Sequence, residues 1–482
     1  MSNSAPSDDP QQSTDSDKLD FKTKLAYGAG DLGPAITANI AIFFLMIFFT
    51  NVAGIPAGLA GSILMIGKIW DAVNDPIVGV LTDKTKSRWG RRLPWLLYGA
   101  VPFGIFFFLQ WIVPRFSANE SANVWWLFWY YVAIGVISQV FYTVVNLPYT
   151  AMTPELTQDY DERTSLNSFR FAFSIGGSIL SLILAKIVFE QIPNREQQYI
   201  VLAAICGVIS VLALYWCVWG VRDRILAFEA KRTQTEEPAS IPYKEQFKIV
   251  FSNRAFLFVI GIYLFSWLAV QVTASIIPYF AVNYMRLRES DVPTVLIAVQ
   301  GTALLMLFVW SALSQRVGKK VVYFMGMSLW ILAQAGLFFL QPGQIAFMYT
   351  LAVMAGFGVS TAYLVPWSMM PDVIELDELQ TGQRREGIFY GFMVLLQKFG
   401  LAFGLFIVGI ALEASGFIEA TPGQSALPTQ PDSALFAIRI ATGPLPAIFL
   451  IAGLFLTFFY PITREMHAEI LLKLRERQQE RG

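Results

Sequence analysis

The chain has 482 residues, of which 55% are hydrophobic and only 15% are charged, and its formal net charge is zero. A soluble protein carries charges on roughly 25% of its residues, so these proportions exclude a water-facing surface and predict lipid surroundings. The neutral balance does not suggest a nucleic-acid partner, and Cys206, Cys217 and the single histidine, His467, are too scattered for a metal or catalytic site.

The apolar residues are grouped in blocks that match the thickness of a membrane. A helix of about 20 apolar residues spans a bilayer core. Such continuous runs exclude a β-barrel, whose strands alternate polar and apolar residues. We therefore predict an all-α membrane protein with twelve transmembrane helices. The blocks begin near positions 28, 57, 93, 123, 167, 198, 255, 292, 320, 343, 384 and 434.

Polar segments divide the chain. Residues 1–23 are rich in Ser, Asp, Pro and Gln and lack the layout of a signal peptide, so we expect a disordered cytoplasmic tail. The longest polar connection, residues 221–253, separates two six-helix halves. The predicted organisation is an N-terminal half at 24–220, a cytoplasmic linker at 221–253, a C-terminal half at 254–460 and a cytoplasmic tail at 461–482.

The two halves carry a faint internal repeat. The fourth block of each half ends in a proline-containing motif, Pro148–Glu155 in the first and Pro366–Asp372 in the second. The second block of each half runs into a short basic turn with a glycine, Gly90 or Gly318. Two parallel six-helix repeats indicate the major facilitator fold with pseudo-symmetric halves.

Lys and Arg concentrate in alternate loops, which orients the chain. By the positive-inside rule, these loops and both termini face the cytoplasm of a cell inner (plasma) membrane. An even number of helices agrees with this orientation. The basic loops lie at 84–92, 222–248, 316–320 and 384–385, and the C-terminal tail adds further Arg and Lys.

The second block contains two acidic residues, Asp71 and Asp75, spaced so that both lie on one helical face. A charge within the membrane costs about 2.5–3.5 kcal/mol or more, and two adjacent like charges cost more unless a cation joins them. The pair therefore predicts a site for a monovalent cation, with sodium favoured by the hard oxygen ligands. The alternative is a simple ion pair, for which Lys68 is correctly spaced.

Further polar residues in later blocks can complete a site. Thr143 and Asn146, one turn apart in block four, offer neutral oxygens, although Asn146 also suits a helix–helix hydrogen bond. Arg170 is either a cytoplasmic gate charge or a snorkelling side chain. Lys398, near mid-membrane in block eleven, needs a carboxylate partner, and Asp71 and Asp75 are the obvious ones.

Charged residues at the predicted cytoplasmic ends form a candidate gate. Asp83, Arg88, Arg91 and Arg92 can act as a charge latch, with Glu155 or Asp161 as partners, or as a topology signal. The corresponding set in the second half is Asp372, Glu375, Arg384 and Arg385.

Three longer motifs resemble the glycoside–pentoside–hexuronide:cation symporter family, to which the bacterial melibiose permease belongs. They are Trp70–Gly79 (WDAVNDPIVG), Ser87–Trp95 (SRWGRRLPW) and Thr381–Tyr390 (TGQRREGIFY), with Lys398 following at the family's distance. The resemblance covers essentially the whole chain. It implies symport of a sugar, glycoside, pentoside or hexuronide with Na⁺, Li⁺ or H⁺.

The resemblance also implies roles for individual residues. Asp71 and Asp75 become the cation carboxylates with help from Thr143, and Lys398 lies between the cation and the sugar. Tyr363 becomes an aromatic platform for the sugar ring. The sugar site departs from the family, because the positions of two sugar-binding aspartates hold Ala35 and Asn146, and an aromatic position holds Thr150. Arg170 matches the sugar-site arginine only after a one-residue gap.

Other functions compete with sugar symport. A sodium-dependent lysophosphatidylcholine symporter has a similar cation site and would tolerate the lost sugar ligands, but a sugar is favoured by polar residues in the blocks, among them Asn146, Gln300 and Gln397. A non-transporting scaffold or sensor has no reason to keep charges in lipid. An enzyme is disfavoured because no nucleophile–base pair occurs. We expect no cofactor, no resident metal and no obligate protein partner, only a small solute, a cation and membrane lipid.

Overall fold

The computed structural model describes residues 19–157, 160–231, 243–383, 385–421 and 427–481. Ten helical spans within these residues are long and apolar enough to cross a membrane. These spans are Phe21–Asn51, Glu120–Leu156, Ser165–Gln191, Arg195–Ala230, Arg254–Tyr284, Glu289–Val317, Lys319–Phe339, Ile345–Thr381, Glu386–Ala414 and Asp432–Phe459.

Two more helices bring the membrane bundle to the predicted twelve. Helix α4 (Ala57–Lys84) is long enough to cross a membrane but carries Lys68, Asp71 and Asp75 near its middle. Helix α5 (Leu93–Leu109) is apolar but shorter than the other spans. Both pack against their neighbours in the first half, α4 on α6 and α5 on α6 and α9. The predicted all-α membrane fold is confirmed.

The helices of the first half follow the predicted blocks. Its first span is broken into α1 (Phe21–Ala29), α2 (Leu32–Ile40), the π-helical η1 (Ala41–Leu45) and α3 (Met46–Asn51). After α4 and α5 come α6 (Glu120–Ala151), the short α7 (Thr153–Leu156), α8 (Tyr160–Gln191) and α9 (Arg195–Lys231).

The second half begins with α10 (Tyr243–Ser252), α11 (Arg254–Tyr279), the π-helical η2 (Phe280–Tyr284) and the 3₁₀ turn η3 (Glu289–Asp291). It continues with α12 (Val292–Val317), α13 (Lys319–Phe339), α14 (Ile345–Thr381) and α15 (Glu386–Ala414). The chain ends with α16 (Asp432–Thr442), α17 (Pro444–Phe459) and α18 (Arg464–Arg481).

The predicted boundaries of the polar segments run through helices. Helix α9 continues past residue 220 to Lys231, and α10 lies within the segment predicted as a linker. The predicted C-terminal tail contains α18. Most of the predicted N-terminal tail, residues 1–18, lies outside the described residues. Helices thus extend beyond the apolar blocks, because a helix end that leaves the membrane can carry polar residues.

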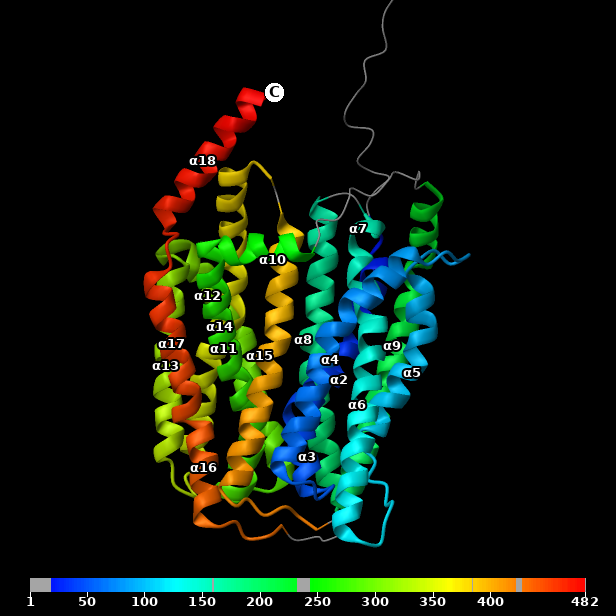
Figure 1. Cartoon of the computed structure of the whole chain (residues 1–482), viewed down its shortest axis with the longest axis vertical. Helices are drawn as coiled ribbons and strands as arrows, with labels where there is room; N and C mark the ends of the chain where they lie inside the picture. The colour runs from blue at the N-terminus through cyan, green and yellow to red at the C-terminus, as the bar shows by residue number, and fades with distance from the viewer. Residues whose placement is uncertain (1–18, 158–159, 232–242, 384, 422–426, 482) are drawn as a thin grey trace, which may run out of the picture.

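The two halves stand side by side, with α2–α9 in one and α11–α17 in the other (Figure 1). We call the end of the bundle that carries α7 and α18 the terminal end, at the top of Figure 1. The opposite end carries α3 and α16 and is called the loop end. Helices α4 and α15 meet across the boundary between the halves and form the most extensive contact in the molecule.

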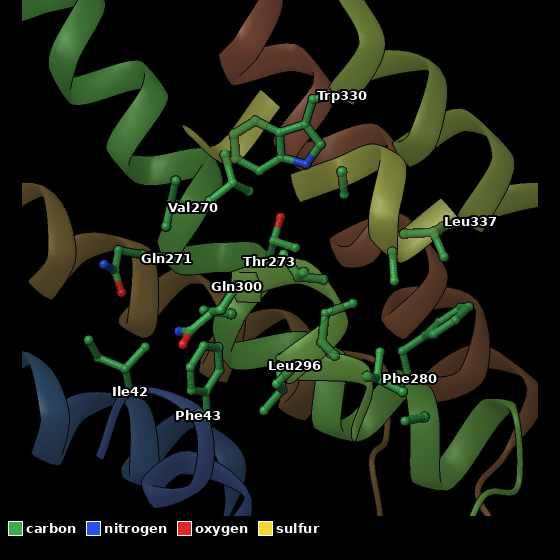
Figure 2. A pocket seen from close by; sticks show the side chains of 18 of the residues that line it. Ile42, Phe43, Val270, Gln271, Thr273, Phe280, Leu296, Gln300, Trp330 and Leu337 are labelled. Carbon is green, nitrogen blue, oxygen red and sulfur yellow. The ribbon is translucent and has the colours of Figure 1, made fainter. Parts of the chain in front are cut away.

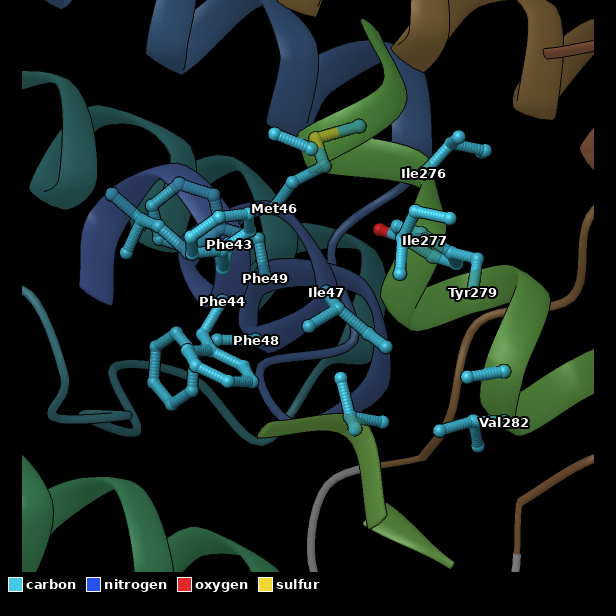
Figure 3. Close-up of a cluster of buried hydrophobic side chains, with 14 of the residues drawn as sticks. Phe43, Phe44, Met46, Ile47, Phe48, Phe49, Ile276, Ile277, Tyr279 and Val282 are labelled. Atoms are coloured by element: carbon cyan, nitrogen blue, oxygen red, sulfur yellow. The ribbon is translucent and has the colours of Figure 1, made fainter. Parts of the chain in front are cut away.

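The first span of each half contains a π-helical segment toward the loop end, η1 in the first half and η2 in the second. A π-helical turn is rare and is often found at functional sites. Its occurrence at the same place in both halves supports the internal repeat. Around these segments, apolar side chains from α2–α3 and α11–η2 pack into one buried cluster (Figure 3).

Polar contacts at the loop end also join the two halves, beside this buried apolar cluster. The hydroxyls of Thr50 and Tyr279 lie 2.8 Å apart, and both residues are fully buried. Arg195 Nε and Glu289 Oε1 form an ion pair at 2.6 Å between the halves. The connection after α15 also crosses over, because Ala420 donates its backbone N–H to the Thr50 carbonyl at 3.2 Å. The contacts between the halves are therefore concentrated at the loop end and at mid-depth.

Candidate functional site

Helix α4 places its charged residues against α15 because the two backbones approach closely near the loop end. A Cβ atom added to Gly61 would lie 3.1 Å from the Leu405 carbonyl and 3.2 Å from Gly409 Cα. Small residues of this kind allow transmembrane helices to pack backbone to backbone. The resulting contact brings Lys398 of α15 to the face of α4 that carries Asp71 and Asp75.

The two carboxylates, one turn apart, converge on the same partners. Lys398 Nζ lies 3.1 Å from Asp71 Oδ1 and 2.6 Å from Asp75 Oδ2. The Thr143 hydroxyl lies 3.2 Å from Asp71 Oδ1 and 3.1 Å from Asp75 Oδ1, so both carboxylates compete for its proton. Asp71 is 2% exposed, whereas the Asp75 side chain is 29% exposed. The site therefore has a buried wall and an accessible side.

Charge is balanced within this cluster. Lys68 Nζ lies 4.0 Å from Asp71 Oδ2 and donates to Gln139 Oε1 at 3.4 Å. Two ammonium groups thus face two carboxylates, and the shorter contacts belong to Lys398. Both partners that the sequence suggested for Asp71 are present. Because buried charges need nearby opposite charges, removal of one group would leave its partners uncompensated.

The oxygen atoms around Lys398 are of the kind that hard cations prefer. They comprise the carboxylates of Asp71 and Asp75, the Thr143 hydroxyl and the Asp71 backbone carbonyl, which lies 3.4 Å from Lys398 Nζ. A metal cation bound to these ligands and the Lys398 ammonium would compete for the same oxygens. Asn146, half-buried on α6 one turn beyond Thr143, offers a further neutral oxygen on that helix.

The remaining predicted substrate residues are spread over both halves. The Thr150 hydroxyl donates to the Leu147 carbonyl of its own helix at 3.0 Å, so this hydroxyl proton is not available to a substrate. Gln397 is half-buried beside Lys398 on α15. Tyr363 is 38% exposed, and its ring packs edge-on against Trp267 with 5.5 Å between centroids.

Arg170 has a partner that the sequence analysis did not single out. Its Nε atom lies 3.4 Å from Asp31 Oδ2, and both side chains are largely buried. Asp31 follows Gly30 at the break between α1 and α2, which presents its carboxylate to α8. The sequence could have pointed to this pair, because Asp31 is a charged residue inside the first apolar block.

A second site, without charge, lies mainly in the C-terminal half (Figure 2). It is a cavity between α11, α12, α13 and α14, closed on one side by Asn39, Ile42 and Phe43 from the first half. Its walls are predominantly apolar and include Val270, Phe280, Leu296 and Leu337. None of its lining residues is charged.

A few polar atoms lie at the side of the cavity that faces the N-terminal half. Gln300 Nε2 donates to Asn39 Oδ1 at 3.0 Å across the boundary between the halves. Among the described residues, Gln271 Oε1 and Trp267 Nε1 are buried and find no hydrogen-bond partner. Buried polar atoms are normally hydrogen-bonded, so these two are available to a ligand. Sequence analysis named Gln300 but could not show that it shares a cavity with Gln271.

At the terminal end of the first half, two arginines converge on one buried glutamate. Arg91 lies 2.6 Å from Glu155 Oε1, and Arg92 lies 3.0 Å from the same atom. Both arginines also approach Asp83, at 3.9 Å and 3.5 Å. Arg88 is exposed at the same end, and the side chain of Asp161 lies outside the described residues. The charge set predicted around Glu155 is thus assembled within one half.

The corresponding residues of the second half are paired differently from the predicted latch. Asp372 accepts from Lys319 Nζ at 2.7 and 2.9 Å, and Glu375 lies 2.6 Å from His467 Nε2. Arg385 bonds Asp377, at 2.6 Å between Nη2 and Oδ1. Arg384 lies outside the described residues. Arg385 pairs with Asp377 because Asp377 lies nearer than Asp372 to the turn between α14 and α15 that carries Arg385.

Two six-helix halves joined around buried charges define a membrane transporter of the major facilitator type. Residues 26–464 match the model of the family described as MFS/sugar transport protein. Because the match covers most of the chain, the protein belongs to this family and is a multi-pass membrane transporter, which implies a small-molecule substrate.

Named relatives cover nearly the full length. An uncharacterized symporter of Synechocystis sp. is 53% identical over 97% of this chain and 99% of its own. The inner membrane symporter YicJ of Escherichia coli is 28% identical over 93% of each chain. The sodium-dependent lysophosphatidylcholine symporter 1 of Gallus gallus is 28% identical over 98% of this chain and 92% of its own.

Solved structures show the same fold at low sequence identity. A bacterial homolog of the human lysosomal transporter Spinster, described as inward-facing and unoccupied, superposes with a TM-score of 0.66 at 12% identity. The superposition covers 94% of this chain and 97% of the other. At this identity the likeness concerns the fold alone.

Proposed function

We propose that the protein is a sodium-coupled symporter of a sugar or a related small polar solute, such as a glycoside, pentoside or hexuronide. The observation that carries this proposal is the convergence of Asp71, Asp75, Thr143 and Lys398 within the membrane. Paired carboxylates at this depth mark ion pathways. Lithium or a proton would satisfy the same oxygens.

The geometry suggests how the cation is coupled to the substrate. In this conformation the Lys398 ammonium pairs with both carboxylates. A sodium ion that enters from the exposed side of Asp75 displaces it, with Thr143 and Asn146 as neutral ligands. The freed ammonium can then bind a hydroxyl or an anionic group of the substrate. Each ligand thereby favours binding of the other, which is the linkage that symport requires.

The halves can exchange access around this site. The positive-inside rule assigns the terminal end to the cytoplasm, and the contacts between the halves are concentrated at the other end. The conformation is then closed toward the outside, as an inward-facing state requires. Rocking of one half against the other would break the loop-end contacts and open the site to the other side. The E. coli relative supports placement in an inner membrane.

Polar groups near the cluster support a sugar. The Asp31–Arg170 pair combines an acceptor and donors, and Asn146 and Gln397 add neutral groups. Such donors and acceptors can hydrogen-bond the hydroxyl groups of a sugar. The family description, which names sugar transport, points the same way.

The uncharged cavity favours a second candidate, a sodium-coupled lysophospholipid symporter. A wall of this composition suits an acyl chain better than a sugar ring, because burial of apolar surface drives such binding. One full-length relative is named a sodium-dependent lysophosphatidylcholine symporter. A non-transporting scaffold or sensor is less well supported, because it would have no use for the buried charges.

The proposal is tested by thermal unfolding of the purified protein with Na⁺, Li⁺ or K⁺, alone and with glycosides, pentosides, hexuronides or lysophosphatidylcholine. We expect Na⁺ to raise Tm where K⁺ does not, and one substrate class to raise it further only with Na⁺. Equal effects of Na⁺ and K⁺ would overturn sodium coupling. A synergistic shift only with lysophosphatidylcholine, matched against a detergent of equal chain length, would replace the sugar with the lipid.

A further inference from the structure

The C-terminal helix α18 is docked on the terminal end of the second half by three kinds of contact. Ile470 is 3% exposed and belongs to the buried cluster that includes Val373 and Ile374 of α14. Arg477 Nη1 donates to the Leu379 carbonyl at 2.6 Å, also on α14. These contacts hold the apolar side of α18 against the end of α14.

The third contact involves the only histidine of the chain. His467 Nε2 lies 2.6 Å from Glu375 Oε2 and 3.4 Å from Asp372 Oδ1. Both acids belong to α14 and are spaced so that they share a helical face. The Asp372 side chain is 7% exposed, while Glu375 and His467 are 20% and 28% exposed. The imidazole is therefore shielded but remains in reach of protons from water.

The charges around His467 balance only when the imidazole is protonated. Lys319 of α13 supplies one positive charge, with its Nζ 2.7 Å from Asp372 Oδ1. Asp372 and Glu375 supply two negative charges. A neutral imidazole leaves one carboxylate uncompensated, whereas an imidazolium closes the balance and makes its hydrogen bonds charge-assisted, which strengthens them.

Other ionisable groups nearby do not replace the imidazole. Arg464, on α18 itself, donates to the Arg316 carbonyl at 2.8 Å, and Glu465 is fully exposed. Tyr460, just before α18, interacts electrostatically with Asp372, and burial raises the pKa of its phenol, so it stays neutral. The charge balance of this cluster is thus decided by whether the His467 imidazole carries a proton.

We propose that His467, Asp372 and Glu375 form a proton-binding site that clasps α18 to the end of α14. Protonation of the imidazole tightens the clasp, and its loss as the pH rises loosens α18. Because α14 also carries Asp377, the partner of Arg385, the clasp acts on the segment where α14 ends and α15 begins. The device adds a pH response to the protein and does not depend on which cation or substrate is transported.

The test is hydrogen–deuterium exchange of the full-length protein in nanodiscs, read on peptides that cover residues 464–477. Exchange is compared at about pH 6 and about pH 8, on either side of the ordinary histidine range, after correction for intrinsic rates. We expect α18 to be protected about three- to tenfold more at the lower pH, the range for a charge-assisted hydrogen bond that is partly exposed. His467→Gln, which keeps a donor but cannot be charged, should abolish this difference.

A matched variant isolates the cluster from general effects on the helix. Lys473 pairs with Glu469 on the exposed side of α18, at 2.5 Å, so Lys473→Gln should retain the full pH response. Glu375→Gln, which removes the nearer acid, should reduce the response as His467→Gln does. Equal protection of wild-type α18 at the two pH values would overturn the proposal, and so would an unchanged pH response in His467→Gln.

Discussion

The charged cluster on α4 and the cavity of the C-terminal half lie in one bundle but use opposite chemistry. In the cluster, two carboxylates, two ammonium groups and one hydroxyl gather along about two helical turns of α4. The cavity has no charged lining residue. The halves are related in fold, so the difference arises from the side chains placed on it.

This comparison indicates that the two regions have different roles in transport. Charges in a low-dielectric setting respond strongly to the arrival of a single cation, so the cluster is suited to energy coupling. An apolar cavity responds to the shape and area of its ligand, so it is suited to selection of a substrate. Lys398 connects the two halves, because it belongs to α15 of the second half but binds the carboxylates of the first.

The largest effect is expected from Asp71→Asn, which keeps the shape of the side chain but removes its charge. Loss of one buried charge partner costs roughly 3–5 kcal/mol, so sodium affinity should fall by at least about 100-fold. The measurement is the sodium-induced rise in Tm together with sodium-stimulated uptake. Asp83→Asn, on the same helix but 47% exposed, is the control and should retain both responses. A normal sodium response of Asp71→Asn would remove the cluster from the cation pathway.

Lys398→Gln should reveal the competition between lysine and cation. Without the ammonium, Asp75 and Asp71 repel each other. We therefore expect the free energy of unfolding in sodium-free buffer to fall by about 3 kcal/mol. Sodium should restore much of this loss, so the sodium-induced shift in Tm becomes larger than in the wild type. Thermal unfolding with and without Na⁺ measures both effects. A smaller sodium shift in the variant would show that Lys398 assists the cation rather than competing with it.

Gly409→Ala tests the close approach that aligns the two regions. The added Cβ would lie 2.5 Å from the Ala57 carbonyl, a backbone atom that cannot move aside easily. Overpacking of this kind costs roughly 1–3 kcal/mol. Gly391→Ala on the same helix is the matched control, because its Cβ would meet no described atom within 4 Å. Similar Tm values for the two variants would argue against a tight α4–α15 contact.

Ala352→Phe fills the cavity and leaves the charged cluster intact. Ala352 is 4% exposed and lines the cavity. If the substrate occupies this space, its apparent affinity should fall about tenfold, which corresponds to about 1.4 kcal/mol, while the sodium shift stays unchanged. Leu332→Phe, at a position 60% exposed, controls for an added aromatic ring. Unaltered substrate affinity would confine recognition to the polar groups around Arg170.

The smallest effect concerns Glu419, outside the membrane spans, which accepts the Ala57 backbone N–H at 3.0 Å. Burial raises the pKa of its carboxyl above the ordinary value of 4.5. The folded state therefore binds the proton more tightly than the unfolded state, so stability falls as the pH rises through the raised pKa. Glu419→Gln keeps the acceptor and should raise Tm near pH 7 but not near pH 4.5. We expect a gain of less than about 1 kcal/mol, since the carboxyl is only partly buried.

Prediction from the sequence was most successful where local chemistry decides the outcome. The apolar blocks identified all twelve spans, because a membrane helix satisfies its own backbone and needs only length and hydrophobicity. The boundary predicted near residue 220 ran through α9, since nothing local requires a helix to end at the membrane surface, whereas the boundary near 461 lies between α17 and α18. The pairing of Lys398 with both aspartates was anticipated, because a buried ammonium within the membrane requires an acid.

Other features followed only from packing between distant segments. The partner of Arg170 is Asp31, 139 positions earlier, and no spacing rule relates the two residues. Of the residues expected to form the second latch (Asp372, Glu375, Arg384 and Arg385), Asp372 pairs with Lys319 and Arg385 with Asp377, because the direction of each helix end selects its neighbours. Similarly, His467 gained two acidic partners although it stands alone in a polar tail.

The sequence alone therefore determined that this protein is a twelve-helix membrane transporter with paired carboxylates in α4. Periodicity and hydrophobicity act over a few turns of one helix, which is the range at which those features are encoded. Only the tertiary structure decided which residues share the uncharged cavity, which charges pair at the helix ends and at which end the halves meet. Those outcomes depend on the relative positions of helices from both halves, and such positions are set by packing over the whole bundle.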